Sequence, residues 1–259
     1  MSAAARKVVS ERMRKLLGRT PEIEGGQVVK AGLSIAALFL STAAYAQPSS
    51  SPGPHVIDLR GVMSGLPSGS AFHPVLPDNT LVPRRGFGLG AGAHVYLMKL
   101  GPARLGVGVE IARARGTAMT PATTTTSTTT TATTSSSATA TSTLSAASPI
   151  ETATTVTLVT PQVSFNFGAR DGWSYLSGGY GSAQIHGAAS GQLTAPATGT
   201  ATLVRDEGRA SAVNYGGGAR WFIREHVAVG FDLRFHRIAA VGTQPATRVF
   251  ALSVGLSVR

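Results

Sequence analysis

The chain has 259 residues, and only 14% of them are charged, below the roughly 25% typical of soluble domains. It contains no cysteine, which excludes disulfide bonds and thiolate metal sites. The formal net charge is +11, but residues 1–46 hold seven Lys and Arg against three Asp and Glu. The remaining basic residues are scattered arginines and Lys99, without a basic run interleaved with aromatics, so the charge does not indicate nucleic-acid binding.

The first element is an apolar run at residues 31–46, which follows Lys30 and ends in Ala44-Tyr45-Ala46. A basic flank, a short apolar core and an A-x-A end are typical of a secretory signal peptide, here with a long n-region, and cleavage is expected after Ala46. The run is too short and too rich in small residues for a spanning helix, although an uncleaved anchor is the alternative. Residues 1–46 are therefore expected to be a signal peptide, and residues 47–54 a linker.

From residue 55 onward, large apolar residues alternate with small or polar ones, which is the pattern of β-strands with one apolar face. Eight such segments follow one another along the chain. They span residues 55–63, 86–98, 104–114, 157–169, 173–187, 211–223, 228–238 and 247–259.

The connections between these segments alternate in length. Segments two and three, four and five, and six and seven are joined by a few turn residues, whereas the other connections are longer. Short turns at one end and long loops at the other predict an all-β fold, an eight-stranded antiparallel up-and-down transmembrane β-barrel at residues 55–259. The longest connection, expected at 117–152, contains a run of only Ala, Ser and Thr at 122–143 and is predicted to be a disordered loop.

Small residues dominate the more polar face of the expected strands, which suits the narrow interior of an eight-stranded barrel. Several aromatic residues fall near strand ends, where an interfacial girdle would lie. They are Phe87, Tyr96, Trp173, Tyr175, Trp221 and Phe222. A soluble periplasmic ligand-binding barrel, with the apolar face inside, shows the same alternation, but the low charge of the polar face favours the membrane protein.

The segment YGGGARWFIREHVAVGFDLRF at residues 215–235 resembles the penultimate hairpin of OmpA-type, opacity-like outer-membrane β-barrels. SYLSGGYGSAQI at residues 174–185 is similar to the preceding glycine-rich strand. The resemblance implies an integral protein of the bacterial outer membrane with a structural, adhesive or surface-interaction role and without enzymatic activity. Members of the family usually end in an aromatic residue, whereas this chain ends at Arg259.

Ionisable residues on the more polar face form one candidate site, expected to be an ion-pair network that closes the lumen. Its expected members are Asp58, Arg60, Arg104, Glu110, Arg220, Asp232, Arg234 and His236. A narrow solute pore through these residues is the alternative function. We expect no catalytic residues, because a deacylase would need a serine close to His236, and we expect no metal site and no cofactor.

The partners expected from this assignment are outer-membrane lipids and lipopolysaccharide. An extracellular partner would bind through the long loops.

Overall fold

The fold is that of a computed structural model, which describes residues 54–122, 144–169, 171–194 and 199–259. The expected signal peptide at 1–46, its cleavage site, and all but the last residue of the 47–54 linker lie outside these residues. The strands are β1 (His55–Gly65), β2 (Arg85–Leu100), β3 (Ala103–Thr120), β4 (Ile150–Ala169), β5 (Gly172–Gln192), β6 (Thr200–Phe222), β7 (Val227–Ile238) and β8 (Thr247–Val258). A short 3-10 helix, η1 (Ser70–Phe72), lies between β1 and β2.

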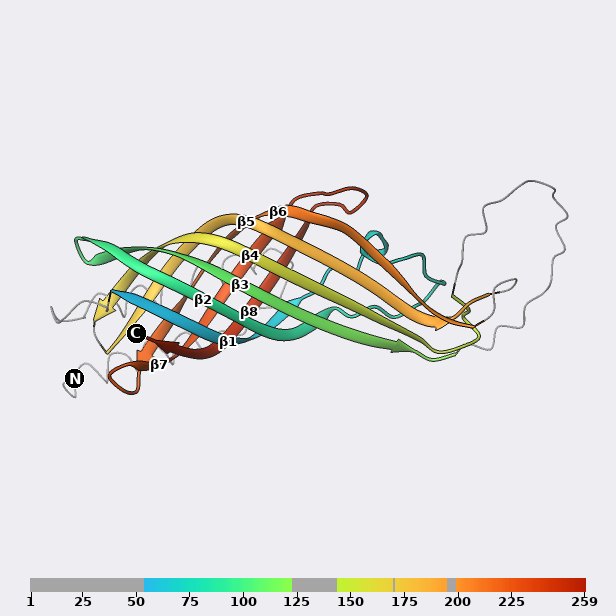
Figure 1. Ribbon diagram of the computed structural model, residues 1–259, viewed down its shortest axis with the longest axis horizontal. Helices are drawn as coiled ribbons and strands as arrows, with labels where there is room; N and C mark the ends of the chain where they lie inside the picture. Colours follow the sequence, from blue (N-terminus) through green and yellow to red (C-terminus); the bar gives the residue numbers. More distant parts are fainter. Residues whose placement is uncertain (1–53, 123–143, 170, 195–198) are drawn as a thin grey trace, which may run out of the picture. The chain divides into compact units, whose positions relative to one another are not determined.

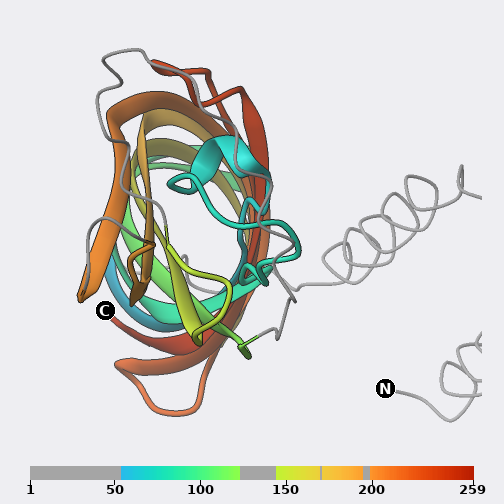
Figure 2. The same cartoon turned by 90° about the vertical axis from the view of Figure 1, so that its right-hand side faces the viewer.

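The eight strands form a closed antiparallel barrel in sequence order (Figures 1 and 2). Each strand pairs with its neighbours in the chain, and β1 closes the ring against β8, with Asp58 opposite Ser257. The predicted fold class and the number of strands are therefore confirmed. In the described part of the chain, no helix is long and apolar enough to cross a bilayer.

The alternation of residue types along the strands separates the two faces of the barrel wall. Leu59 and Leu89 are 62% and 68% exposed on the outside. Asp58 and Arg220, which point inward, are only 1% and 2% exposed. The apolar face is thus outside and the ionisable face inside, which is the opposite of the arrangement expected for a soluble ligand-binding barrel.

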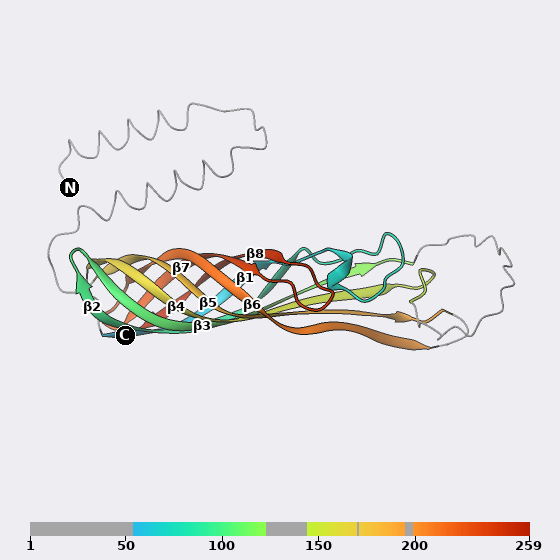
Figure 3. The ribbon, with the colours of Figure 1, turned by 90° about the horizontal axis from the view of Figure 1, so that it is seen from above.

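Four strands are longer than the sequence pattern predicts, as Figure 3 shows for β3 to β6, which reach well past the ends of the other strands. The N-terminal part of β6, from Thr200, and the C-terminal part of β5, to Gln192, were expected to belong to a long loop. Instead they pair with each other, and only residues 193–199 connect them. The prediction of a long connection there was wrong.

The predicted loop at 117–152 is also wrong at both of its ends. Residues 117–120 of β3 pair with residues 150–153 of β4. The Ala/Ser/Thr-rich core of that prediction, at 123–143, lies outside the described residues. The extensions escaped detection because their outer face is mostly polar, with Val204 and Met119 as exposed apolar exceptions, so the alternation disappears although threonine favours strands.

The lumen is filled by side chains in three layers. At the end with the short turns, Val56, Tyr96, Trp173 and Tyr175 are buried against one another and against Phe222. The ionisable residues fill the middle. At the end with the long connections lies a larger apolar cluster, which includes Val62, Phe72, Val156, Leu158, Ile185, Ile238 and Val249.

The aromatic residues at the strand ends are divided between the two faces. Phe87 and Trp221 are exposed on the outside, 68% and 50%, as an interfacial girdle requires. Tyr96, Trp173 and Tyr175 instead lie inside the lumen, and the assignment of these three to a girdle was wrong. Burial of a large ring inside the barrel removes apolar surface from water, and the neighbouring glycines leave room for it.

The connection between β1 and β2 folds back over the lumen at the end with the long connections (Figure 2). Phe72 is part of the apolar cluster there, and a Cβ atom at Gly187 would collide with the Phe72 carbonyl. The adjacent His73 is 1% exposed. Burial lowers the pKa of His73 from its ordinary value of 6.5, and the nearby Pro67 backbone opposes this shift.

The strand wall tolerates a methyl group at some glycines and not at others. A Cβ atom at Gly218 would collide with the Phe231 carbonyl and lie 2.8 Å from the Tyr175 hydroxyl. We expect Gly218→Ala to lower the free energy of unfolding by about 1–3 kcal/mol, measured by urea titration of the refolded barrel. The control is Gly61→Ala, because the nearest atom to its Cβ is the Val254 carbonyl oxygen at 3.8 Å. Equal stability of the two variants would contradict the close packing at Gly218.

Acidification should loosen the connection that carries His73. Since the folded pKa is lowered, the neutral ring is the form that the fold prefers, and the stabilisation is complete above pH 6.5 and lost as the pH falls below it. We expect the hydrogen-exchange protection of the Phe72 and His73 amides to fall between about pH 7.5 and about pH 5. In His73→Phe the hydrogen-exchange protection of these amides should not depend on pH. A pH-dependent loss of protection in that variant would show that protonation of His73 is not the cause.

Candidate functional site

The candidate site is the ionisable layer in the middle of the lumen, and Asp58 on β1 is the centre of the first of its two groups. Arg220 on β6 donates two hydrogen bonds to Asp58, Nε to Oδ1 at 3.0 Å and Nη2 to Oδ2 at 2.7 Å. Arg60 Nη2 donates to Oδ2 at 2.7 Å, and the Ser257 hydroxyl on β8 donates to Oδ1 at 2.5 Å. Asp58 therefore joins β1 to β6 and β8 through charge-assisted bonds.

A second group forms around Arg234 on β7. Its Nε lies 2.7 Å from Asp232 Oδ1 and 2.9 Å from Glu110 Oε2 on β3. Arg60 connects the two groups, since its Nη1 lies 3.6 Å from Asp232 Oδ2 and 3.7 Å from Glu110 Oε1. Three carboxylates thus face three guanidinium groups, and the layer is electrically balanced.

Uncharged side chains complete the network. Tyr175 donates to Asp232 Oδ2 at 2.5 Å, and its ring lies 4.3 Å from the guanidinium carbon of Arg220, a cation–π contact. Gln162 Oε1 accepts a hydrogen bond from Arg234 Nη1. Gln162 Nε2 donates to Glu110 Oε2 at 3.4 Å and lies 3.2 Å from His94 Nε2. The sequence analysis missed Tyr175, Gln162, His94 and Ser257, although the alternation already places the last three on the inward face.

Two of the predicted members lie outside the network that the other six form. Arg104 is partly exposed near the short-turn end of β3, and two inward positions, Gly106 and Gly108, separate it from Glu110. His236 is 4% exposed and lies one inward position beyond Arg234, next to the apolar cluster. Among the described residues, His236 Nδ1 has no hydrogen-bond partner.

The geometry of the layer suits structural ion pairing better than chemistry on a substrate. None of the six charged members is more than 8% exposed. Each carboxylate lies within ion-pair distance of at least two guanidinium groups. Within the described ranges, no three His, Asp or Glu side chains lie together in a group that could hold a metal ion.

No protein-family model matches the sequence, and no curated protein matches it. Among solved structures, the chain is similar to Ail, the attachment invasion locus protein of Yersinia pestis, with 13% identity over 80% of this chain and 99% of that one and a TM-score of 0.45. It is also similar to Neisserial surface protein A, with 12% identity over 81% of this chain and 99% of that one and a TM-score of 0.40. A third is the outer membrane protease OmpT of Escherichia coli, with 8% identity over 82% of this chain and 98% of that one and a TM-score of 0.36. At these values the similarities assign no activity, and the fold assignment depends on the strand pairing itself.

Arg220 provides the most direct test of the network. Arg220→Ala leaves Asp58 buried with fewer donors, so we expect a loss of about 3–5 kcal/mol in the free energy of unfolding and a lower melting temperature. The control is Arg205→Ala, since Arg205 pairs with Glu207 at 3.2 Å where both side chains are 26% exposed, and such pairs contribute about 0–1 kcal/mol. Heat-modifiable gel mobility that is unchanged in Arg220→Ala would argue against the network.

Proposed function

We propose that this chain is an integral β-barrel of the bacterial outer membrane with a structural or surface-interaction role, and that its lumen is closed to solutes. One observation carries the proposal. A closed barrel exposes its apolar side chains on the outside and buries a balanced ion-pair layer inside. In water, burying the charged side chains and exposing the leucines would be unfavourable. In lipid, the outer face of a barrel must be apolar, and the interior can hold the charged side chains.

The outer face supports membrane insertion in detail. Large apolar side chains are exposed all round the barrel, among them Ile57, Leu89, Val109, Phe165, Leu176, Tyr215, Val229 and Leu256. Every strand has a partner on both sides along the barrel itself. A bilayer offers no water to backbone groups, so only a closed ring or a helix satisfies them there.

The layers of the lumen support a closed barrel rather than a narrow solute pore. The ionisable layer lies between the aromatic cluster around Trp173 and the apolar cluster around Ile238. A hydrated solute would have to cross both apolar layers and break ion pairs between them. Pairing of the six charged groups favours a structural role over solute transfer.

Exposed arginines support a contact with anionic lipids at the end with the long connections. Arg237 on β7 and Arg248 on β8 are opposite each other in register, and both are exposed. Arg113 and Arg115 occupy outward positions of β3, opposite Leu89 and Phe87 of β2. Guanidinium groups bind phosphates through paired hydrogen bonds, so this end suits the phosphates of outer-leaflet lipids and lipopolysaccharide.

We infer that the barrel is not an enzyme. The inference is supported by the burial of the lumen carboxylates, which places them out of reach of a lipid or peptide substrate. His236, the residue with the best sequence-based case for chemistry, lies under the apolar cluster rather than at an open rim.

The proposal is tested by fractionation of a Gram-negative host that expresses the full chain. We expect the protein to sediment with outer membranes, to resist carbonate extraction and to change gel mobility on heating. In planar bilayers the purified barrel should produce no discrete conductance steps, and with lipopolysaccharide it should release no fatty acid. Recovery in the periplasm would overturn the membrane assignment, conductance steps would establish the pore, and fatty-acid release would establish an enzyme.

A further inference from the structure

One edge of the sheet is unpaired where β6 extends past the barrel. Between Thr200 and Ala210, β6 pairs with β5 only, because the Ser211 carbonyl already accepts from Ala239 N and the pairing with β7 begins at Ala212 opposite Ile238. Across the described residues, no strand pairs with the other edge of this part of β6. An edge of this kind presents a row of backbone donors and acceptors to a further strand.

The backbone groups that face the open edge follow from the register. Ser145 N donates to the Gln192 carbonyl, so the backbone groups of Gln192 point toward β4 and away from β6. Gln192 is opposite Thr200, and the direction alternates from residue to residue in an antiparallel pair. Thr200, Thr202, Val204 and Asp206 therefore direct both N–H and C=O to the open edge, whereas Leu203 and Arg205 bond to β5.

The connection between β1 and β2 lies against the inward face of the same extension. Leu81 donates its N–H to Thr120 Oγ1 on β3 at 2.8 Å. Its carbonyl accepts from Thr152 Oγ1 on β4 at 2.7 Å, and both threonines occupy inward positions. These hydrogen bonds of Leu81 go to side chains of β3 and β4 and leave the β6 edge open.

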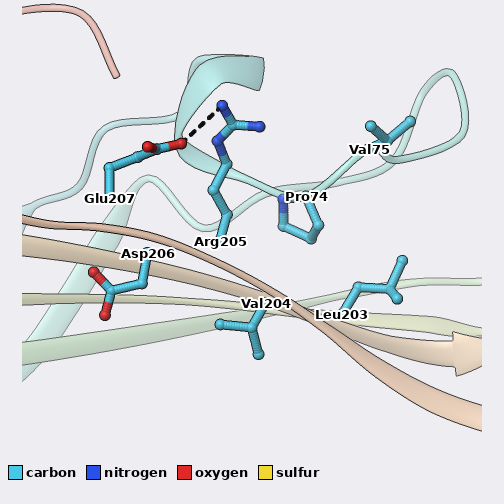
Figure 4. Close-up of a pocket in the computed structure, with 7 residues that line it drawn as sticks. All are labelled: Pro74, Val75, Leu203, Val204, Arg205, Asp206 and Glu207. Atoms are coloured by element: carbon cyan, nitrogen blue, oxygen red, sulfur yellow. Dashed lines mark ion pairs between the residues drawn. The ribbon is translucent and has the colours of Figure 1, made fainter. Parts of the chain in front are cut away.

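A hollow of about 380 Å³ lies beside the open edge. Figure 4 shows the residues that line it. Pro74 and Val75 line it from the connection between β1 and β2, and residues 203–207 line it from β6. Val75 is 62% exposed and Val204 is 55% exposed, so two apolar side chains stand uncovered there. Side chains on the two faces of an added strand would bury the exposed surfaces of Val75 and Val204.

The charged groups at this edge are held in place. Arg205 Nη2 lies 3.2 Å from Glu207 Oε1, and Thr243 bonds to both side chains. Asp206 accepts from Gly208 N at 2.9 Å and from Gln184 Nε2 at 2.7 Å. The Gly208 bond lowers the pKa of Asp206, which is therefore ionised at neutral pH. Two carboxylates against one guanidinium favour a cationic side chain on the partner.

We propose that the open edge of β6, from Thr200 to Asp206, binds an extended segment of another protein as an added β-strand. In this complex an apolar side chain of the segment packs at Val75 on one face of the added strand, and a basic side chain lies near Asp206 on the other face, because successive side chains of a strand point to opposite faces. Strand addition combines backbone hydrogen bonds for affinity with alternate side-chain contacts for specificity. The proposal rests on the proposed function, because the edge is free only if this end of the barrel lies outside the membrane.

A second copy in the same membrane does not fit the edge. Two barrels inserted in the same direction are related by rotation about the membrane normal, so their β6 strands run in the same sense relative to the membrane. Antiparallel pairing of the two edges would require one copy to be inverted. The occupant is therefore a segment of a different molecule.

The test uses the refolded full chain in lipid nanodiscs and an acetylated six-residue peptide of alternating valine and lysine. We expect the peptide to bind and to raise the hydrogen-exchange protection of the Thr202 and Val204 amides. The Leu203 amide, bonded to β5, should be protected with or without peptide. Two N-methylated analogues, one modified at every valine and one at every lysine, should differ in affinity by about tenfold or more, because only one set of amides faces β6.

Variants at Val204 separate backbone pairing from contact with the side chain. Val204→Pro removes an edge-facing N–H without touching the β5 ladder, and proline is tolerated on such edges. We expect it to weaken binding by about tenfold while Val204→Thr, which keeps the N–H, changes it by less than about threefold. Heat-modifiable mobility of both variants verifies that the barrel folds.

Several outcomes would overturn the strand-addition site. Equal affinity of the two N-methylated peptides, or equal binding by the two Val204 variants, would show that the backbone edge is not used. Protection of the Thr202 and Val204 amides before peptide is added would show that another part of the chain already occupies the edge. Each of these results leaves the outer-membrane location untouched, since fractionation tests that location separately.

Discussion

Asp58 is the residue on which the closure of the barrel depends most. It lies on the first strand, opposite Ser257 of the last strand, and accepts bonds from both Ser257 and Arg220. The β1–β8 seam is therefore joined by side chains in the lumen as well as by the backbone ladder. A buried carboxylate is stable only with such donors, so the seam and the ion-pair layer form together.

The glycines of the wall are the counterpart of this layer. The Cβ position at Gly92 is 3.6 Å from Asp58 Oδ2, and the one at Gly230 is 3.2 Å from Arg220 Cγ. The interior of an eight-stranded barrel is just wide enough for side chains to fill it. Long charged side chains therefore need neighbouring residues that have no side chain. The same crowding supports the proposed closed state of the lumen, and it links that state to the stability of the barrel.

Beyond the closed barrel, strands β3 to β6 continue as an open sheet. The outer face of the extension of β3 to β6 is largely polar, whereas the closed barrel exposes large apolar side chains. The connection that carries Phe72 and Leu81 covers the lumen and the inward face of the extension. The β6 edge beside Val75 remains open, which is why we assign binding to this side.

The sequence by itself determined the eight strands, their order and the placement of the six paired charges on one common face, because an alternation of two residues identifies the faces of a strand wherever one face is apolar. It did not determine which face was outside, because both arrangements produce the same pattern. Nor did it reveal the ends of β3 to β6, where the outer face is largely polar and the alternation disappears. Only the tertiary structure separated Arg104 and His236 from the network and brought in Tyr175 and Gln162. Contacts across the lumen join residues far apart in the chain, and their partners depend on the register of every strand between them.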